Sequence, residues 1–240
     1  MAKATADLVA SFRTDETVGD DVPPSWNVAP TDGVRIVTER LKHDGELSRR
    51  LATAKWGLVP AWAKDPKSGA KLINARMETV TEKPSFRKAA VKRRALVPAA
   101  GYYEWEKKDD GGKIPTYLFS ESEPLIAFAG LYEWWPDPAL PEDHPEKWLL
   151  SCTIITTAAA DALGHIHDRT PLIVPRDLQE DWLNPQLTDK ADVQGLLESI
   201  PEPRLVPRRV SSKVNNVRNN GPDLIEEDPD RLSGALGAGP

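Results

Sequence analysis

Hydrophobic positions recur along the chain in two different patterns. Leu8, Val9 and Phe12 lie at helical spacing within residues 4–13, which predicts a short helix with one buried face. Short runs of aliphatic and aromatic residues, bounded by Gly, Pro and Asp, predict strands instead. The expected strands span residues 34–38, 47–56, 96–97, 102–105, 116–119, 125–132, 148–156 and 204–210. The charged stretch 40–46 should turn between the first two strands.

Helical patterns separate these groups of strands. We expect helices over residues 83–93, 176–183 and 189–198, an ordered irregular segment over 57–74, and an exposed proline-rich loop over 136–147. The fold class is therefore predicted as α+β, with a mixed, largely antiparallel, barrel-like sheet as the core and helices at its periphery. A single domain over residues 1–227 is expected, followed by a disordered tail over 228–240, whose small side chains cannot form a core.

Composition narrows the class of protein further. The 22 prolines among 240 residues argue against a helical bundle, because proline costs about 3 kcal/mol inside a helix. No apolar run approaches the ~20 residues that span a bilayer, and the first residues lack the layout of a secretory signal, so we expect a cytoplasmic protein. The net charge of -6 disfavours broad, salt-driven binding to long nucleic acid, although a local basic groove is compatible with it.

Four polar segments lie among apolar neighbours and are candidates for chemistry. Residues 26–30 (WNVAP) fit a turn with a buried tryptophan or a binding loop. Asn74 and Arg76 would face the same side of a strand, with a surface ion pair as the alternative for the arginine. Glu104 lies between aromatic residues, where desolvation would raise its pKa and suit it to proton transfer, unless it is a rim residue.

The fourth segment is HIHDRTP, residues 165–171. Its two histidines could ligate a metal, but no other histidine or cysteine cluster supplies further ligands, so we expect no metal site. One histidine used for proton transfer and oriented by Asp168 is the better functional interpretation. The only cysteine, Cys152, lies in an apolar strand run and is interpreted as inert packing, with a catalytic thiol as the alternative.

Basic residues form two clusters, each of which could be a solvated face or part of a groove that follows a phosphate backbone. The clusters comprise Arg87, Lys88, Lys92, Arg93 and Arg94, and then Arg204, Arg208, Arg209, Lys213 and Arg218.

Taken in order, the segments WNVAP, KWGLVPAWAKD, LINARMETVTEKPSFR, LVPAAGYYEW, FAGLYEWW, CTIITTAA, HIHDRTPLIV and VNNVRNNGPDLIE resemble the SOS-response-associated peptidase family. Members of this family shield abasic sites in single-stranded DNA. The resemblance runs from Asp7 to Glu226. It implies single-stranded DNA with abasic sites as the partner, a monomer, no cofactor and no membrane, and association with the nucleoid during action on DNA.

The resemblance also implies a mechanism. Family members begin Met-Cys-Gly-Arg; after self-removal of the methionine, the cysteine α-amine forms a Schiff base with the ring-opened abasic sugar and the thiol closes a thiazolidine crosslink. By resemblance, Asn74 hydrogen-bonds the N-terminal residue or the sugar and Arg76 holds a phosphate. Glu104 shuttles the proton for ring opening and methionine removal, and His167 assists at the aldehyde.

Three further residues are implied to contact DNA. Trp62 resembles the aromatic wedge that blocks stacking beyond the lesion, and Asn27 and Pro30 belong to the WNVAP segment. The chain departs from the family at position 2, which is Ala2, and contains no Cys-Gly-Arg. We expect about half a dozen residues, including the nucleophile, to be missing before the helix over 4–13.

Other readings of that departure stay open. Removal of Met1 would expose the α-amine of Ala2, which has a reference pKa of ~7.7–8.0 and could form a reversible Schiff base but not a thiazolidine. The chain could also be an inactive single-stranded-DNA-binding module, or a peptidase that acts on other proteins.

Overall fold

Two β-sheets form the framework of the molecule. The computed structural model describes residues 3–107, 111–159 and 168–228. Eight strands make the large sheet, in the order β1-β3-β2-β5-β8-β9-β10 with β4 paired to β9, and the small sheet has the order β11-β7-β6. The strands are β1 (Glu16–Val18), β2 (Gly33–Leu41), β3 (Leu47–Trp56), β4 (Asn74–Arg76), β5 (Arg94–Ala99), β6 (Tyr102–Lys107), β7 (Lys113–Phe119), β8 (Ile126–Pro136), β9 (Trp148–Ala158), β10 (Arg169–Pro171) and β11 (Val206–Arg209).

The large sheet closes on itself. Besides its place beside β2, strand β3 pairs in parallel with β9 through Lys55↔Ser151 and Trp56↔Cys152, so β2, β3, β5, β8 and β9 form a barrel. Strands β1 and β4 are also parallel to their partners, whereas the remaining pairings are antiparallel. The predicted α+β class with a mixed, largely antiparallel, barrel-like core is therefore confirmed.

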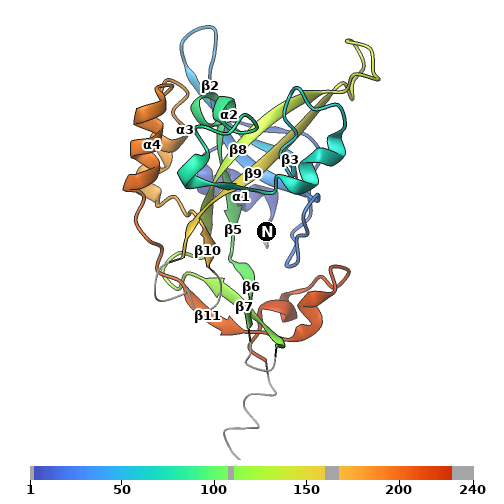
Figure 1. The fold of residues 1–240 in the computed structure, drawn as a ribbon, viewed down its shortest axis with the longest axis vertical. Coiled ribbons are helices and arrows are strands. Elements are labelled where there is room, and N and C mark those ends of the chain that lie inside the picture. The colour runs from blue at the N-terminus through green and yellow to red at the C-terminus, as the bar shows by residue number, and fades with distance from the viewer. Residues whose placement is uncertain (1–2, 108–110, 160–167, 229–240) are drawn as a thin grey trace, which may run out of the picture.

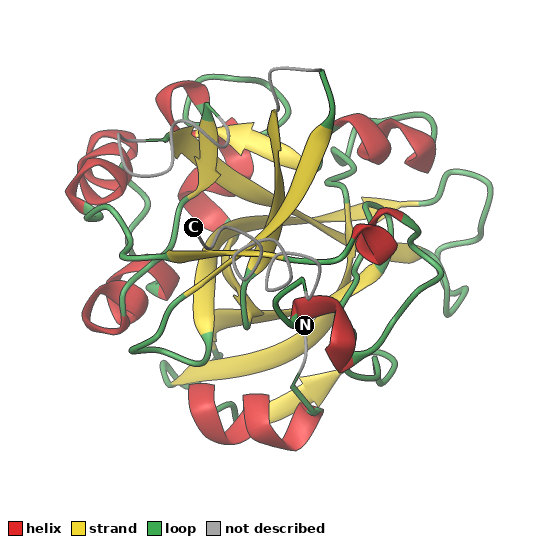
Figure 2. Cartoon of the chain, turned by 90° about the horizontal axis from the view of Figure 1, so that it is seen from below, coloured by secondary structure: helices red, strands yellow, loops and turns green. Residues whose placement is uncertain are grey.

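Short helices cover the outside of the barrel (Figure 2). The α-helices are α1 (Thr5–Phe12), α2 (Arg87–Lys92), α3 (Gln179–Leu183) and α4 (Lys190–Ser199). The 3₁₀ helices are η1 (Pro66–Lys71), η2 (Met77–Thr79), η3 (Arg176–Leu178), η4 (Ser212–Asn215) and η5 (Pro222–Ile225). Within the described residues no helix is long and apolar enough to cross a membrane.

Strand alternation gives the barrel two cores. Side chains at every second position, such as Val34, Ile36 and Cys152, point inward and fill the barrel. The positions between them, such as Leu51 and Ile155, point outward and pack against the apolar faces of the helices, including Leu8 and Phe12 of α1 and Trp182 of α3. Because both faces of these strands are buried, the two apolar layers hold the barrel strands rigidly in place.

The small sheet lies beyond one end of the barrel (Figure 1). The chain passes from β5 to β6 through Gly101, where a Cβ atom would lie only 2.4 Å from the Leu118 carbonyl oxygen. Glycine is therefore required for this close passage. We call the region between the small sheet and the end of the barrel, where β5 and β9 end and β2 begins, the barrel–sheet junction.

Most predicted elements are present, although several bounds differ and the three-residue strands β1 and β10 were not predicted. Strand β2 extends to Leu41 because it pairs with β3 to the end of the hairpin, so the turn expected from residue 40 starts later. Helix α2 begins at Arg87, since residues 83–86 form turns rather than part of the helix predicted over 83–93. Apart from Asp228, the tail predicted over 228–240 lies outside the described residues, as do positions 1–2.

Candidate functional site

Asn74 and Arg76 lie on the short strand β4, beside the C-terminal part of β9. The register pairs Asn74 with Ile154 and Arg76 with Thr156, and Ala75 between them is fully buried. Both polar residues are exposed on the same face, so the strand prediction for this pair is confirmed. Within the described residues neither side chain makes a hydrogen bond or an ion pair, which leaves an amide and a guanidinium available to a ligand.

Glu104 lies on β6, on the same face of the small sheet as Tyr102. The Tyr102 hydroxyl is 2.8 Å from Thr170 Oγ1 on β10, which ties this face of the small sheet to the barrel. Burial raises the pKa of Tyr102, and the nearby Glu104 carboxylate raises it further. Glu104 is only partly exposed. Its exposure therefore lies between that expected of a desolvated acid and that expected of a residue on the rim.

Strand β10 lies between the segment that carries Asn74 and Arg76 and the small sheet that carries Glu104. Pro171 of β10 and Arg76 of β4 both pair with Thr156, from opposite sides of β9. Asn74, Arg76 and Glu104 therefore all lie on elements that meet at the barrel–sheet junction. His167, the other expected participant, and its neighbour His165 lie outside the described residues.

A charged pair that sequence reasoning missed lies beside Arg76. The Arg169 guanidinium binds the Glu78 carboxylate with two hydrogen bonds, of 2.6 and 3.0 Å, and also donates to the Thr156 carbonyl oxygen at 2.5 Å. These donors and the charge of Arg76 lower the pKa of Glu78. Glu78 lies two residues after Arg76 and Arg169 two residues after position 167, so proximity in sequence was the signal that could have identified them.

Asn27 performs a structural task in the WNVAP segment. Its side-chain amide nitrogen donates to the backbone carbonyls of Val214, Asn216 and Asn219, at 3.0, 3.2 and 3.2 Å. We call residues 211–221, which receive these bonds, the asparagine loop. Asn220 Oδ1 accepts the Trp26 amide proton at 2.8 Å from the same segment. The WNVAP segment is therefore bonded to the C-terminal part of the chain.

The asparagine loop is also bonded to β6. The Trp105 indole donates to Asn215 Oδ1 at 2.7 Å, and the Tyr103 hydroxyl donates to the Trp26 carbonyl oxygen at 2.8 Å. Both aromatic side chains lie on the face of β6 opposite to Glu104. Pro30 is exposed in the turn that leads to β2.

Trp62 is the most exposed aromatic side chain among the described residues, at 66%. It nevertheless lies on a well-anchored segment, because the buried Trp135 indole donates to the Ala63 carbonyl oxygen at 2.7 Å. The same segment starts at Gly57, where a Cβ atom would lie 2.6 Å from the Gly69 carbonyl oxygen. An exposed indole on an anchored segment is suited to stacking against a base.

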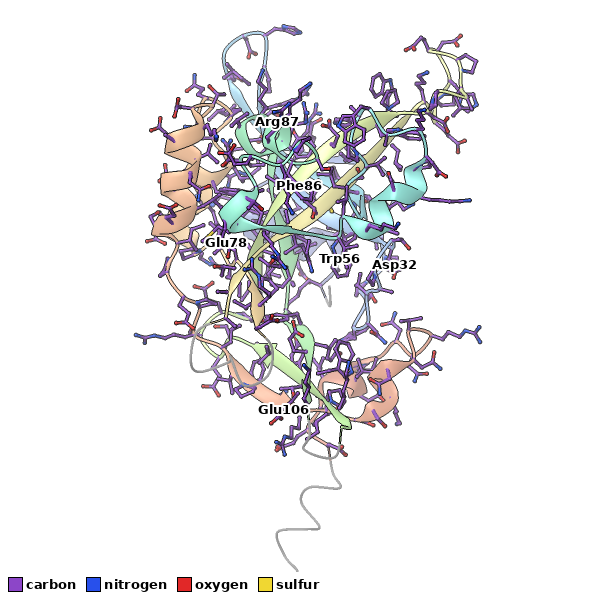
Figure 3. The ribbon with its side chains drawn as sticks, in the orientation of Figure 1. Asp32, Trp56, Glu78, Phe86, Arg87 and Glu106 are labelled. Atoms are coloured by element: carbon purple, nitrogen blue, oxygen red, sulfur yellow. The ribbon has the colours of Figure 1, made fainter. Side chains whose placement is uncertain are left out.

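The two basic clusters do not form one continuous surface. Arg94 is buried, donates to the carbonyls of Ala90, Trp182 and Asn184, and has a pKa lowered to about 10 by desolvation. Arg87 lies toward the end of the molecule away from Glu106 of the small sheet (Figure 3). Several others have partners within the protein. Arg93 pairs with Glu133, Arg209 with Glu106, and the exposed Lys213 with Asp223, whereas Arg208 donates to the Ile225 carbonyl oxygen and lies over the Phe119 ring.

Cys152 lies inside the barrel and is fully buried. Burial raises the pKa of its thiol to about 12, so the reactive thiolate is scarce at neutral pH. The interpretation of Cys152 as inert packing is therefore supported over a catalytic role. Among the described residues, no three His, Cys, Asp or Glu side chains gather as metal ligands would.

The first described helix starts near the barrel–sheet junction. Arg35, two residues into β2, donates to Thr5 Oγ1 at 2.9 Å and to Asp21 Oδ1 at 2.5 Å. Thr5 itself donates to Asp21 at 2.6 Å. Because β2 begins at the junction, the first turn of α1 lies at the same end of the barrel as Asn74 and Arg76.

The family model and the similar sequences point to one family. Residues 1–217 match the family described as SOS response associated peptidase (SRAP). The chain is 42% identical over 221 residues to the abasic site processing protein YoqW of Bacillus subtilis (strain 168), covering 92% of this chain and 94% of the relative. It is 31% identical over 202 residues to the abasic site processing protein YedK of Escherichia coli (strain K12), covering 84% and 83%. A crystal structure of a protein from Bacteroides thetaiotaomicron aligns with a TM-score of 0.77 and 25% identity, over 95% of this chain and 97% of that one.

Proposed function

Because the chain belongs to the SOS response associated peptidase family, we propose that it binds single-stranded DNA and processes abasic sites at the barrel–sheet junction. The relatives at 31–42% identity that carry the name abasic site processing protein support the reaction class. The observation that carries the proposal for this chain is the exposed pair Asn74 and Arg76, whose side chains have no bonded partner within the described residues. Polar groups fixed on a buried strand but left unpaired are suited to a polar ligand.

Each junction residue has a distinct role in the proposal. Arg76 binds a phosphate flanking the lesion, since a guanidinium matches two phosphate oxygens at once. Asn74 orients the opened sugar or the attacking amine by hydrogen bonding. Glu104 transfers the proton that accompanies ring opening, aided by His167, and the exposed indole of Trp62 stacks on the strand next to the lesion.

The covalent step uses an amine and, where one is present, a thiol. The amine nitrogen adds to the sugar aldehyde carbon and water leaves, which forms a Schiff base. A thiol can then add to the imine carbon while its proton passes to the nitrogen, which gives a thiazolidine with no change in oxidation state. Position 2 of this chain is Ala2, whose amine, once Met1 has been removed, supports only the first, reversible step.

The test compares two proteins on one substrate. The unaltered chain and a version with Met-Cys-Gly-Arg placed before Lys3 are each incubated with a single-stranded oligonucleotide that carries one abasic site, with and without borohydride. The products are separated by denaturing electrophoresis. We expect a heat-stable adduct with the restored start and an adduct that needs borohydride with the Ala2 start. An undamaged oligonucleotide is the control.

Variants assign the roles within that assay. Glu104→Gln should slow adduct formation while leaving DNA affinity unchanged, whereas Arg76→Ala should weaken binding and reduce its salt dependence, because one phosphate contact is lost. If neither start gives an adduct but abasic DNA still binds, the chain is a binding module without covalent chemistry. If single-stranded DNA does not bind at all, the proposal is wrong.

A further inference from the structure

A buried arginine bonds the start of α1 to the barrel. The Arg35 side chain lies on β2 and is only 2% exposed. Its guanidinium donates to Thr53 Oγ1 at 2.8 Å, to Thr5 Oγ1 at 2.9 Å and to Asp21 Oδ1 at 2.5 Å. The Thr5 hydroxyl in turn donates to Asp21 at 2.6 Å. We call these four residues the Arg35 cluster. Because a buried cation is costly without its acceptors, Arg35 holds all three of them in place.

The contacts of α1 also determine its direction along the barrel. Arg35 pairs with Thr53 near the barrel–sheet junction, where β2 begins at Gly33. Arg49, which precedes Thr53 on β3 and lies farther from the junction, donates to the Phe12 carbonyl oxygen at 3.1 Å. Helix α1 therefore begins beside the junction and runs away from it, so its N-terminus is directed toward the junction.

Within the described part of the chain, few other contacts hold the first turn of α1. Ala4, the N-cap residue, makes no side-chain cap hydrogen bond, and Ala6 and Asp7 are exposed. Leu8 is the first residue of the helix that is buried in the core. Thr5 is therefore the side chain through which the first turn is bonded to the barrel.

We propose that Arg35 is a positioning residue that, through Thr5, keeps the α-amine of the chain within reach of an opened sugar at the barrel–sheet junction. The inference rests on the proposed function and deepens it, because it names the group that places the nucleophile. Three residues separate Thr5 from Ala2, whose amine is free once Met1 has been removed. Three residues span at most about 11 Å, so a fixed Thr5 confines the amine to a small volume and raises its effective concentration.

Loss of the Thr5 hydroxyl should lengthen this tether. If the first turn frays as far as Leu8, six residues rather than three separate Ala2 from the nearest anchored residue. Effective concentration falls as about the −3/2 power of tether length, so doubling the length lowers it about threefold. We therefore expect Thr5→Val, which keeps the shape of the side chain, to slow adduct formation about threefold at saturating protein. Thr5→Ser keeps the hydroxyl and should restore the rate.

The experiment measures the initial rate of adduct formation on a single-stranded oligonucleotide with one abasic site, with protein in excess. Aliquots are quenched with borohydride, which reduces the Schiff base to a stable amine. The dependence on protein concentration gives the maximal rate and the concentration at half of that rate. Binding without chemistry is measured by fluorescence anisotropy on the same oligonucleotide with a tetrahydrofuran residue as the abasic analogue.

Two further variants separate the first turn from the rest of the helix. Arg35→Lys keeps the buried charge, but one ammonium group cannot reproduce the fork of a guanidinium, so it should slow the reaction as Thr5→Val does. The double variant should be no slower than either single variant, because both act through one bond. Arg49→Lys is the matched control, since it loosens the contact with Phe12 at the opposite end of the same helix.

The expected result is a lower maximal rate with Thr5→Val and with Arg35→Lys, at an unchanged half-saturating concentration and an unchanged affinity for the analogue. An unchanged maximal rate with Thr5→Val, the same fall with Arg49→Lys, or no recovery with Thr5→Ser overturns the inference and leaves the proposed function intact. Urea unfolding of each variant shows that the rate changes do not come from loss of the fold.

The same series is run with the Met-Cys-Gly-Arg start, so that a chain unreactive with Ala2 still gives a rate. If neither start gives an adduct, the covalent part of the proposed function and this inference are both wrong.

Discussion

Asn27 gives the sharpest test of the difference between a residue that contacts DNA and one that builds the site. By family resemblance it is expected to contact DNA, yet its side-chain nitrogen donates to three backbone carbonyls of the asparagine loop. The segment is only partly buried, so water can replace some of the lost bonds in a variant. We therefore predict that Asn27→Ala stays folded but loses stability and frees residues 211–221.

The magnitude follows from the bonds. A hydrogen bond contributes about 0.5–1.5 kcal/mol net, and the two amide protons are shared among three acceptors, so Asn27→Ala should lower the free energy of unfolding by about 2 kcal/mol. Asn27→Asp should lower it by more, because a carboxylate cannot donate and would face three carbonyl oxygens. Asn220→Ala, which removes bonds to Trp26 N and Ser25 Oγ, is the milder control at about 1 kcal/mol.

Urea unfolding measures the stability change, and limited trypsin digestion measures the loop directly. Lys213 and Arg218 are exposed cleavage sites within the asparagine loop, so both should be cut faster in Asn27→Ala than in the unaltered protein. The structural role is refuted if Asn27→Ala has a free energy of unfolding within about 0.5 kcal/mol of that of the unaltered protein, is cut by trypsin at the same rate, and loses DNA binding. Asn27 would then act on DNA directly.

Three further predictions concern the barrel and the junction. In the folded protein Cys152 should resist alkylation by iodoacetamide at pH 8 and should react only after unfolding, because burial raises its pKa to about 12. Fast labelling of the folded protein would contradict this prediction. Gly101→Ala should lower the free energy of unfolding by about 2 kcal/mol, because its Cβ atom would lie 2.4 Å from the Leu118 carbonyl oxygen. An unchanged urea midpoint would show that β6 can shift to make room for the methyl group at little cost. The pKa of Glu78 is lowered from 4.5, so its ion pair with Arg169 stabilises the fold above that pH and is lost as the pH falls below it. The difference in unfolding free energy between the unaltered protein and Glu78→Gln should therefore shrink in acid. A constant difference from pH 7 to pH 3 would refute the contribution of the pair.

The local elements of this fold could be predicted, whereas the closure of the barrel could not. The strand predicted over 47–56 has the observed bounds of β3, because its boundaries are marked by turn residues and apolar alternation. The parallel contact between Trp56 and Cys152 that closes the barrel joins segments almost a hundred residues apart. Periodicity within a segment carries no information about such a partner.

The three-residue strands show the same limit at the site. Strand β10 has no apolar alternation of its own and exists because β9 offers it an edge. Glu78 and Arg169 lie near candidate residues in the sequence, but only the register of β4 and β10 on β9 brings them into a bidentate pair. By contrast, the prediction that Asn74 and Arg76 share a face needed only the period of a strand, and it is confirmed.

Strand β10 links the two halves of the candidate site through neighbouring residues. Arg169 and Thr170 point to opposite faces because they are adjacent in a strand. The first binds Glu78 on the β4 side of the barrel, and the second binds Tyr102 on the small sheet. A slip of one residue in the pairing of β10 with β9 would reverse both side chains and break both contacts at once. The register of this strand thus helps to hold the segment that carries Arg76 against the sheet that carries Glu104, although neither residue belongs to it.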